Sequence, residues 1–87
     1  MEKMEFFKRH DSFTICVGDS CYTLSIGEAS TLEQKTRRLL ERMGVEYNEV
    51  EISSKFFCTD FQQKTHIVSR GDLLDVWYAL KKVLKIK

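Results

Sequence analysis

The chain has no proline, only four glycines and only three cysteines among its 87 residues. Without proline or glycine-rich stretches there is no candidate linker, so we expect one compact domain over residues 1–87. Three irregularly spaced cysteines are too few for the disulfide framework of a small secreted scaffold. We therefore expect a reducing, cytoplasmic location.

Long apolar runs and an excess of charge of one sign are also missing. No segment reaches the ~18 consecutive apolar residues of a membrane helix, and the polar amino-terminal segment is unlike a signal peptide. Fourteen Lys and Arg against thirteen Asp and Glu give a net charge of +1. This charge predicts neither a nucleic-acid nor a membrane partner, and any such binding would need a local basic patch.

Alternation of apolar and polar residues predicts a β-hairpin near the amino terminus. Residues 12–17 and 20–26 alternate with period two, and Gly18-Asp19 between them suits a two-residue type II′ turn. This turn places Cys16 opposite Cys21. The outer face then carries only Ser, Thr and Cys, and the inner face carries Phe13, Ile15, Val17, Tyr22, Leu24 and Ile26.

Two helices are expected from their end signals. Ser30 and Glu33 have the spacing of a capping box, which predicts a first helix from Ser30 to a stop at Gly44. Ser69 and Asp72 repeat the amino-terminal signal and predict a second helix that runs nearly to the end of the chain.

The remaining segments suggest further strands. Residues 45–52 predict a strand with a bulge near Asn48, residues 55–59 and 64–68 predict two more around a turn at 60–63, and residues 4–9 suggest a short extra one. The order strand-strand-helix-strand-strand-helix predicts an α+β fold, a two-layer sandwich with a mostly antiparallel sheet and both helices on one face.

The cysteine pair is a redox candidate. Cys16 and Cys21 would face each other at the close, non-hydrogen-bonded spacing of ~4.5 Å, where a reversible disulfide is sterically possible. Two free thiols on a polar face are the alternative, because the hairpin contains no Lys, Arg or His that would lower a thiol pKa.

Two surfaces are candidates for binding. On the first helix, Lys35, Arg37, Arg38 and Arg42 could contact phosphates of a nucleic acid, with Phe56, Phe57 and Phe61 as a stacking platform. The alternative is a solvated helix face with aromatic residues in the core. On the second helix, Leu74 and Tyr78 would extend an apolar surface outward, which suggests a partner groove or self-association.

Signatures of catalysis or metal binding are missing. There is no Ser-His-Asp order, paired-carboxylate site, phosphate loop or nucleotide fingerprint. His10, His66 and Cys58 are isolated, so no local spacing favours zinc. We expect no enzyme, no metal and no cofactor.

From Tyr22 to about Leu80 the order of segments resembles a glutaredoxin. Residues 22–26 would match the first strand, residues 31–43 the first helix, residues 44–52 the next strand, and residues 65–74 the last strand and the start of the last helix. The Cys-x-x-Cys motif of that family is replaced by Ser30-Thr31-Leu32-Glu33, its cis-proline loop is missing, and the link after Ile52 is too short for its second helix. The resemblance implies, as an alternative, a degenerate glutaredoxin- or thioredoxin-like fold without thiol exchange at Ser30 and Glu33.

The leading hypothesis is a small protein-binding or adaptor module that forms a homodimer, through an exposed strand edge or through Leu74 and Tyr78. A thiol-based redox protein or sensor that uses Cys16 and Cys21 is the first alternative. Nucleic-acid binding through the basic helix face is the second.

Overall fold

The computed structural model describes residues 2–44, 46–57 and 63–85. It confirms the α+β class and the antiparallel pairing of the strands. In chain order the elements are β1 (Met4–Lys8), β2 (Phe13–Val17), β3 (Ser20–Leu24), α1 (Ile26–Met43), β4 (Glu49–Ser53), the 3₁₀ turn η1 (Ser54–Phe56), β5 (Thr65–Ser69) and α2 (Arg70–Leu84).

The predicted hairpin is confirmed residue by residue. β2 and β3 pair from Val17 opposite Ser20 to Phe13 opposite Leu24. Gly18 has a φ of +58° whereas Asp19 keeps a negative φ, as in a type II′ turn. β1 pairs with β2 and completes a three-stranded sheet, called sheet A below. The prediction that Ile26 faces inward from the hairpin was wrong, because Ile26 is the first residue of α1 and is 57% exposed.

β4 and β5 form a separate two-stranded antiparallel sheet, called sheet B below. The strand predicted over 45–52 instead begins at Glu49, so the shift in the apolar pattern marks the start of β4 and not a bulge. The strand predicted over 55–59 is wrong where it can be checked, since η1 is a 3₁₀ turn. Residues 58–59 and most of the predicted turn at 60–63 lie outside the described residues.

The N-cap of the first helix lies five residues before the predicted one. Ser25 is the N-cap: its hydroxyl accepts a hydrogen bond from the Glu28 amide, and the Glu28 carboxylate accepts one from the Ser25 amide. The predicted box at Ser30 and Glu33 is therefore wrong. The earlier start buries Ala29, and it leaves Glu33 inside the helix, where its side chain is also buried.

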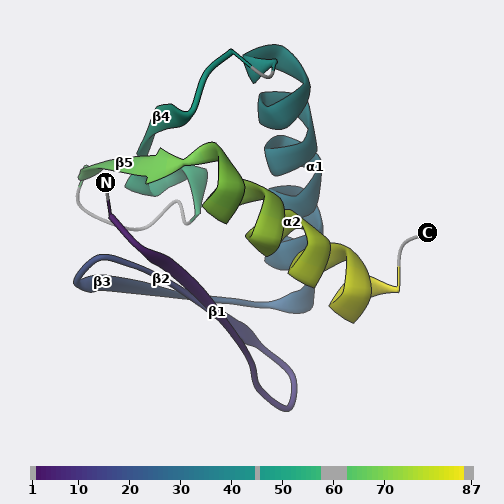
Figure 1. Ribbon diagram of the computed structural model, residues 1–87. Helices are drawn as coiled ribbons and strands as arrows, with labels where there is room; N and C mark the ends of the chain where they lie inside the picture. Colours follow the sequence, from purple (N-terminus) through teal and green to yellow (C-terminus); the bar gives the residue numbers. More distant parts are fainter. Residues whose placement is uncertain (1, 45, 58–62, 86–87) are drawn as a thin grey trace.

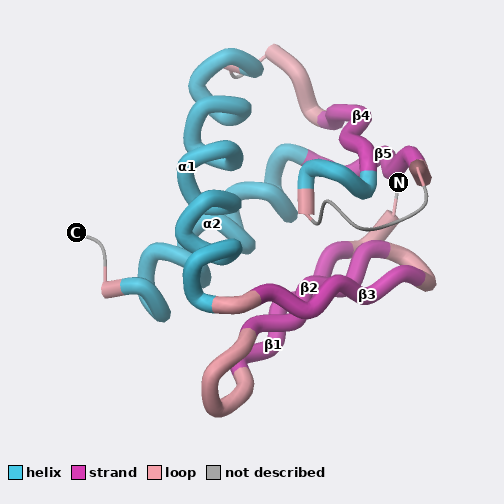
Figure 2. Tube along the Cα trace, turned by 180° about the vertical axis from the view of Figure 1, so that it is seen from behind, coloured by secondary structure: helices cyan, strands magenta, loops and turns pink. Residues whose placement is uncertain are grey.

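The second helix is confirmed, with Ser69 as its N-cap. Its apolar stripe packs on α1 and on β1 of sheet A. Figures 1 and 2 show both helices and sheet B on the same side of sheet A, which gives the predicted arrangement of helices over one face. The core lies between these layers, and its fully buried side chains include Ile15, Leu24, Leu32, Leu73 and Leu80.

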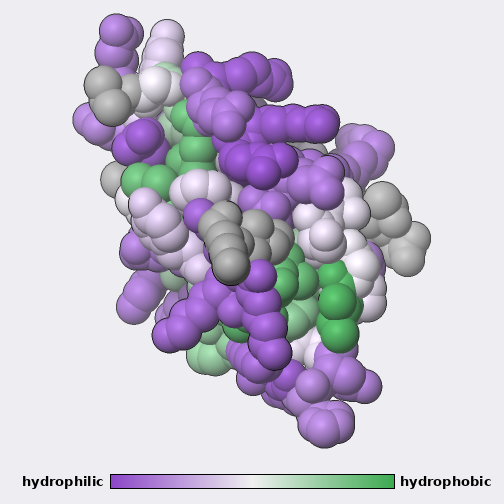
Figure 3. Space-filling model, turned by 90° about the vertical axis from the view of Figure 1, so that its right-hand side faces the viewer, coloured by the Kyte–Doolittle hydropathy of each residue, from purple (hydrophilic) through white to green (hydrophobic). Residues whose placement is uncertain are grey.

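The surface beside α1 is mostly hydrophilic. In Figure 3, which faces α1 and the end of α2, hydrophobic residues reach the surface only in small separate groups. The described residues seen in this view therefore form no broad apolar patch of the kind that large obligate interfaces use.

Candidate functional site

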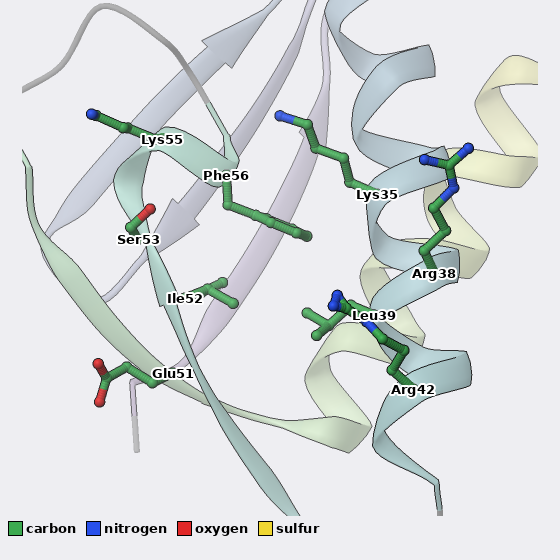
Figure 4. A pocket seen from close by; sticks show the side chains of 9 residues that line it. All are labelled: Lys35, Arg38, Leu39, Arg42, Glu51, Ile52, Ser53, Lys55 and Phe56. Carbon is green, nitrogen blue, oxygen red and sulfur yellow. The ribbon is translucent and has the colours of Figure 1, made fainter.

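A groove of about 480 Å³ lies between α1 and β4 (Figure 4). We call it the α1–β4 groove. α1 contributes side chains spaced one turn apart along one face, and β4 and η1 form the opposite wall. The groove is lined by Lys35, Arg38, Leu39, Arg42, Glu51, Ile52, Ser53, Lys55 and Phe56.

The groove has an apolar floor and a cationic rim. The floor is formed by Leu39, Ile52 and Phe56, and in Figure 4 Ile52 and Phe56 point from the β4 side toward α1. The rim cations are Lys35, Arg38, Arg42 and Lys55. Within the described residues none of these four takes part in an ion pair, so they are available to an anionic ligand.

A smaller hollow of about 220 Å³ continues the groove toward the amino-terminal half of α1. It shares Lys35, Lys55 and Phe56 with the α1–β4 groove. An elongated ligand could therefore contact both hollows.

The backbone of β4 is open on one side. The Arg70 amide donates to the Asn48 carbonyl and the Ser54 amide donates to the Lys64 carbonyl, so the even-numbered residues of this strand pair with β5. The N–H and C=O groups of the odd-numbered residues, Glu49, Glu51 and Ser53, must then point away from β5. β5 is the only neighbour of β4 among the described strands.

This open edge lies beside the α1–β4 groove. Figure 4 shows the groove between β4 and α1, and Glu51 and Ser53 of the open edge are among the residues that line it. Backbone groups and cations that have no partner among the described residues thus occur together with an apolar floor.

The four basic residues predicted to form one surface lie at two different hollows. Lys35, Arg38 and Arg42 line the groove, whereas Arg37 lines a hollow of about 270 Å³ on another side of α1. The predicted stacking platform is not formed as proposed. Phe56 lines the groove, Phe57 is buried in the core, and Phe61 lies outside the described residues.

Cys16 and Cys21 are joined by a disulfide, and their Cα atoms are 4.0 Å apart. The bond lies on the outer face of sheet A, in a hollow of about 520 Å³ that Phe7 and Arg9 also line. Arg9 is a cation that the hairpin sequence alone does not contain; it reaches this face because β1 pairs with β2. Cys58 lies outside the described residues.

A buried polar chain joins the two sheets. The Tyr22 hydroxyl lies 2.7 Å from His66 Nε2, and His66 Nδ1 lies 3.0 Å from a carboxylate oxygen of Glu2. The second oxygen of Glu2 accepts from the Ile67 amide. Hydrogen bonding to His66, and secondarily to that amide, holds the pKa of Glu2 below its ordinary value. His66 lies in β5, and its side chain is fully buried.

The partner-binding candidates on α2 differ in exposure. Tyr78 is 58% exposed, whereas Leu74 is partly buried against the core and lines the hollow that contains Arg37. Next to Tyr78, the Trp77 indole donates to the buried carboxylate of Glu33 at 2.8 Å. Sequence reasoning missed this bond because Glu33 was placed in a cap.

No protein-family model, curated protein or solved structure matches the chain. Among the described residues no helix could cross a membrane, and no three metal-binding side chains cluster. The glutaredoxin resemblance stays a prediction, although β3 and β4, which overlap its first two matched strands, lie in separate sheets.

Proposed function

We propose that the chain is a non-enzymatic protein-binding module that accepts an extended segment of a partner as an added strand at β4. The observation that carries this proposal is the open backbone edge at Glu49, Glu51 and Ser53 beside the α1–β4 groove. Addition of a strand pairs main-chain groups that are otherwise left to water, and neighbouring pockets for alternate side chains give specificity.

The geometry favours a different chain over a second copy at this edge. Two copies paired through β4 about a two-fold axis would bring both α1 helices, each with its rim cations, to the same interface. Like charges would repel each other there. Self-association then fits the exposed Tyr78 side of α2 better.

Proline at Glu51 tests strand addition. The Glu51 N–H points away from β5, so Glu51→Pro removes a donor at the open edge and leaves the bonds between β4 and β5 in place. The matched control Glu51→Ala removes the carboxylate and keeps the N–H. Thermal unfolding of both variants checks that they fold.

A random peptide library displayed on phage supplies ligands without any assumption about their charge. We expect selection on the native chain to enrich peptides rich in Val, Ile and Thr and free of proline. These peptides should bind the Glu51→Ala variant, and their affinity for Glu51→Pro should be at least about tenfold lower, since several main-chain hydrogen bonds to the peptide are lost. Enriched peptides that bind both variants equally would refute the proposal.

The disulfide supports a second function, a thiol-based redox switch. In the cytoplasmic location that we propose, Cys16 and Cys21 would be thiols at rest. Oxidation forms one S–S bond as the two thiols give up two protons and two electrons, which a peroxide or a glutathione disulfide would accept. Mild oxidation should lower the mass of the peptide that contains Cys16 and Cys21 by about 2 Da. No change in mass would remove this function.

A further inference from the structure

The geometry points to the class of segment that β4 accepts: we infer that it is acidic and carries one large apolar side chain. This inference rests on the proposed strand addition, and the charge and shape of the α1–β4 groove provide the new evidence. The rim cations have no carboxylate partner among the described residues. The apolar floor at the same site needs an apolar group to cover it.

The rim cations have a spacing that an extended chain can match. Lys35 and Arg42 are seven residues apart on α1, which corresponds to about 10.5 Å along the helix. A strand advances about 3.4 Å per residue, so three or four residues of the ligand span this distance. Side chains four residues apart in a strand share a face and leave one position between them on that face for an apolar side chain.

The one carboxylate of the groove does not neutralise the rim. Glu51 is exposed, and in Figure 4 its side chain points away from α1. Acidic side chains of a bound strand would therefore meet the rim cations without competition from Glu51. An apolar side chain between them would reach the apolar floor.

A peptide fits these observations better than a nucleic acid does. A nucleic acid would use the rim cations but would leave the N–H and C=O groups of β4 unpaired. Stacking of successive bases also needs more than one exposed aromatic ring, and Phe57 is buried. We therefore treat oligonucleotide binding as an outcome of the test.

The test uses four fluorescein-labelled peptides of about nine residues, a length that covers the open edge of β4. The parent has Leu at its centre, Glu two residues to either side and Thr elsewhere. The second replaces Glu with Lys, and the third replaces Leu with Ser. The fourth is the parent with N-methyl groups on the amides that would pair with β4. Fluorescence anisotropy gives each affinity.

The arginines of α1 supply matched variants. Arg38→Gln combined with Arg42→Gln removes two rim cations, and Arg37→Gln makes the same change on the same helix outside the groove. Gln and Arg have similar helix propensities, so we expect all variants to fold. The double variant should bind the parent peptide about tenfold more weakly, and Arg37→Gln should stay within about twofold of the native chain.

The inference is supported if the parent peptide binds at least about tenfold more tightly than the Lys and the Ser peptides, and if the double variant loses that preference for Glu. Equal binding of the Glu and Lys peptides, with loss on N-methylation, would overturn the inference and leave strand addition standing. Binding unaffected by N-methylation, or no binding of any peptide, would overturn strand addition and this inference with it. In a competition experiment, oligothymidylate and unlabelled parent peptide are each used to displace the labelled parent peptide. If oligothymidylate displaces it at the lower concentration, the inference is overturned in favour of a nucleic acid.

Discussion

Removal of one hydroxyl tests the buried chain that joins the two sheets. Tyr22→Phe keeps the ring, which stacks on Phe57 at 5.1 Å between centroids, and removes the oxygen that lies 2.7 Å from His66 Nε2. That nitrogen is fully buried, so it loses its partner where no water replaces it. An unsatisfied buried polar group costs about 1–3 kcal/mol. A central value of about 2 kcal/mol lowers Tm by roughly 8–16 °C in a domain of this size.

Circular dichroism during heating measures this change. Tyr47→Phe is the matched control, because it removes the same hydroxyl from a side chain that is 61% exposed, and we expect its Tm to stay within about 2 °C of the native value. If Tyr22→Phe unfolds at the same temperature as Tyr47→Phe, the hydroxyl does not stabilise His66 and our account of the buried chain is wrong.

Three further predictions concern pH, oxidation and assembly. The fold lowers the pKa of Glu2 from its ordinary 4.5, so the stabilisation by Glu2 is complete above that pH and is lost as the pH falls through the lowered value. In an acid titration followed by circular dichroism, the stability of Glu2→Gln should therefore fall less steeply with decreasing pH than that of the native chain. An equal fall in both proteins would contradict this. Reduction of the disulfide between Cys16 and Cys21, which closes a short loop, should lower the free energy of unfolding by about 2 kcal/mol in urea titrations; an unchanged midpoint would exclude a stabilising role. Light scattering should give the mass of two chains for the native protein and of one chain for Tyr78→Ser, and equal masses would exclude Tyr78 from self-association.

The hairpin was predictable because the alternation of its residues distinguishes the polar face from the apolar one. Small polar residues and cysteines alternate with large apolar ones, and a shift by one residue would bury the former and expose the latter. The α1 cap was not predictable in the same way. Ser25 with Glu28 and Ser30 with Glu33 both have the spacing of a capping box, and local sequence does not distinguish them. In the folded chain Glu33 instead accepts a hydrogen bond from Trp77, 44 residues away in the sequence, and this contact has no local signal.

The groove depends on tertiary structure in a similar way. Arg37 and Arg38 are neighbours in the chain, but successive helix residues are rotated by about 100°, so only one of them faces β4. The sequence shows that both are basic and not which one lines a groove. Lys55 joins the rim because η1 turns the chain where a strand was predicted. The bond between Glu2 and His66 spans 64 residues, and no local signal indicates it.

The disulfide and the α1–β4 groove lie on opposite sides of sheet A, and one row of aromatic rings lies between them. Tyr22, which follows Cys21, stacks on Phe57. Phe57 in turn meets Phe56 on the groove floor edge to face, with the two ring centroids 5.4 Å apart. The hairpin register is set by buried side chains and not by the S–S bond, so reduction should leave these rings in place. We therefore expect equal peptide affinities for the oxidised and reduced chains. A difference that disappears in Phe57→Leu would instead show that this row of rings couples the redox state of the hairpin to binding at β4.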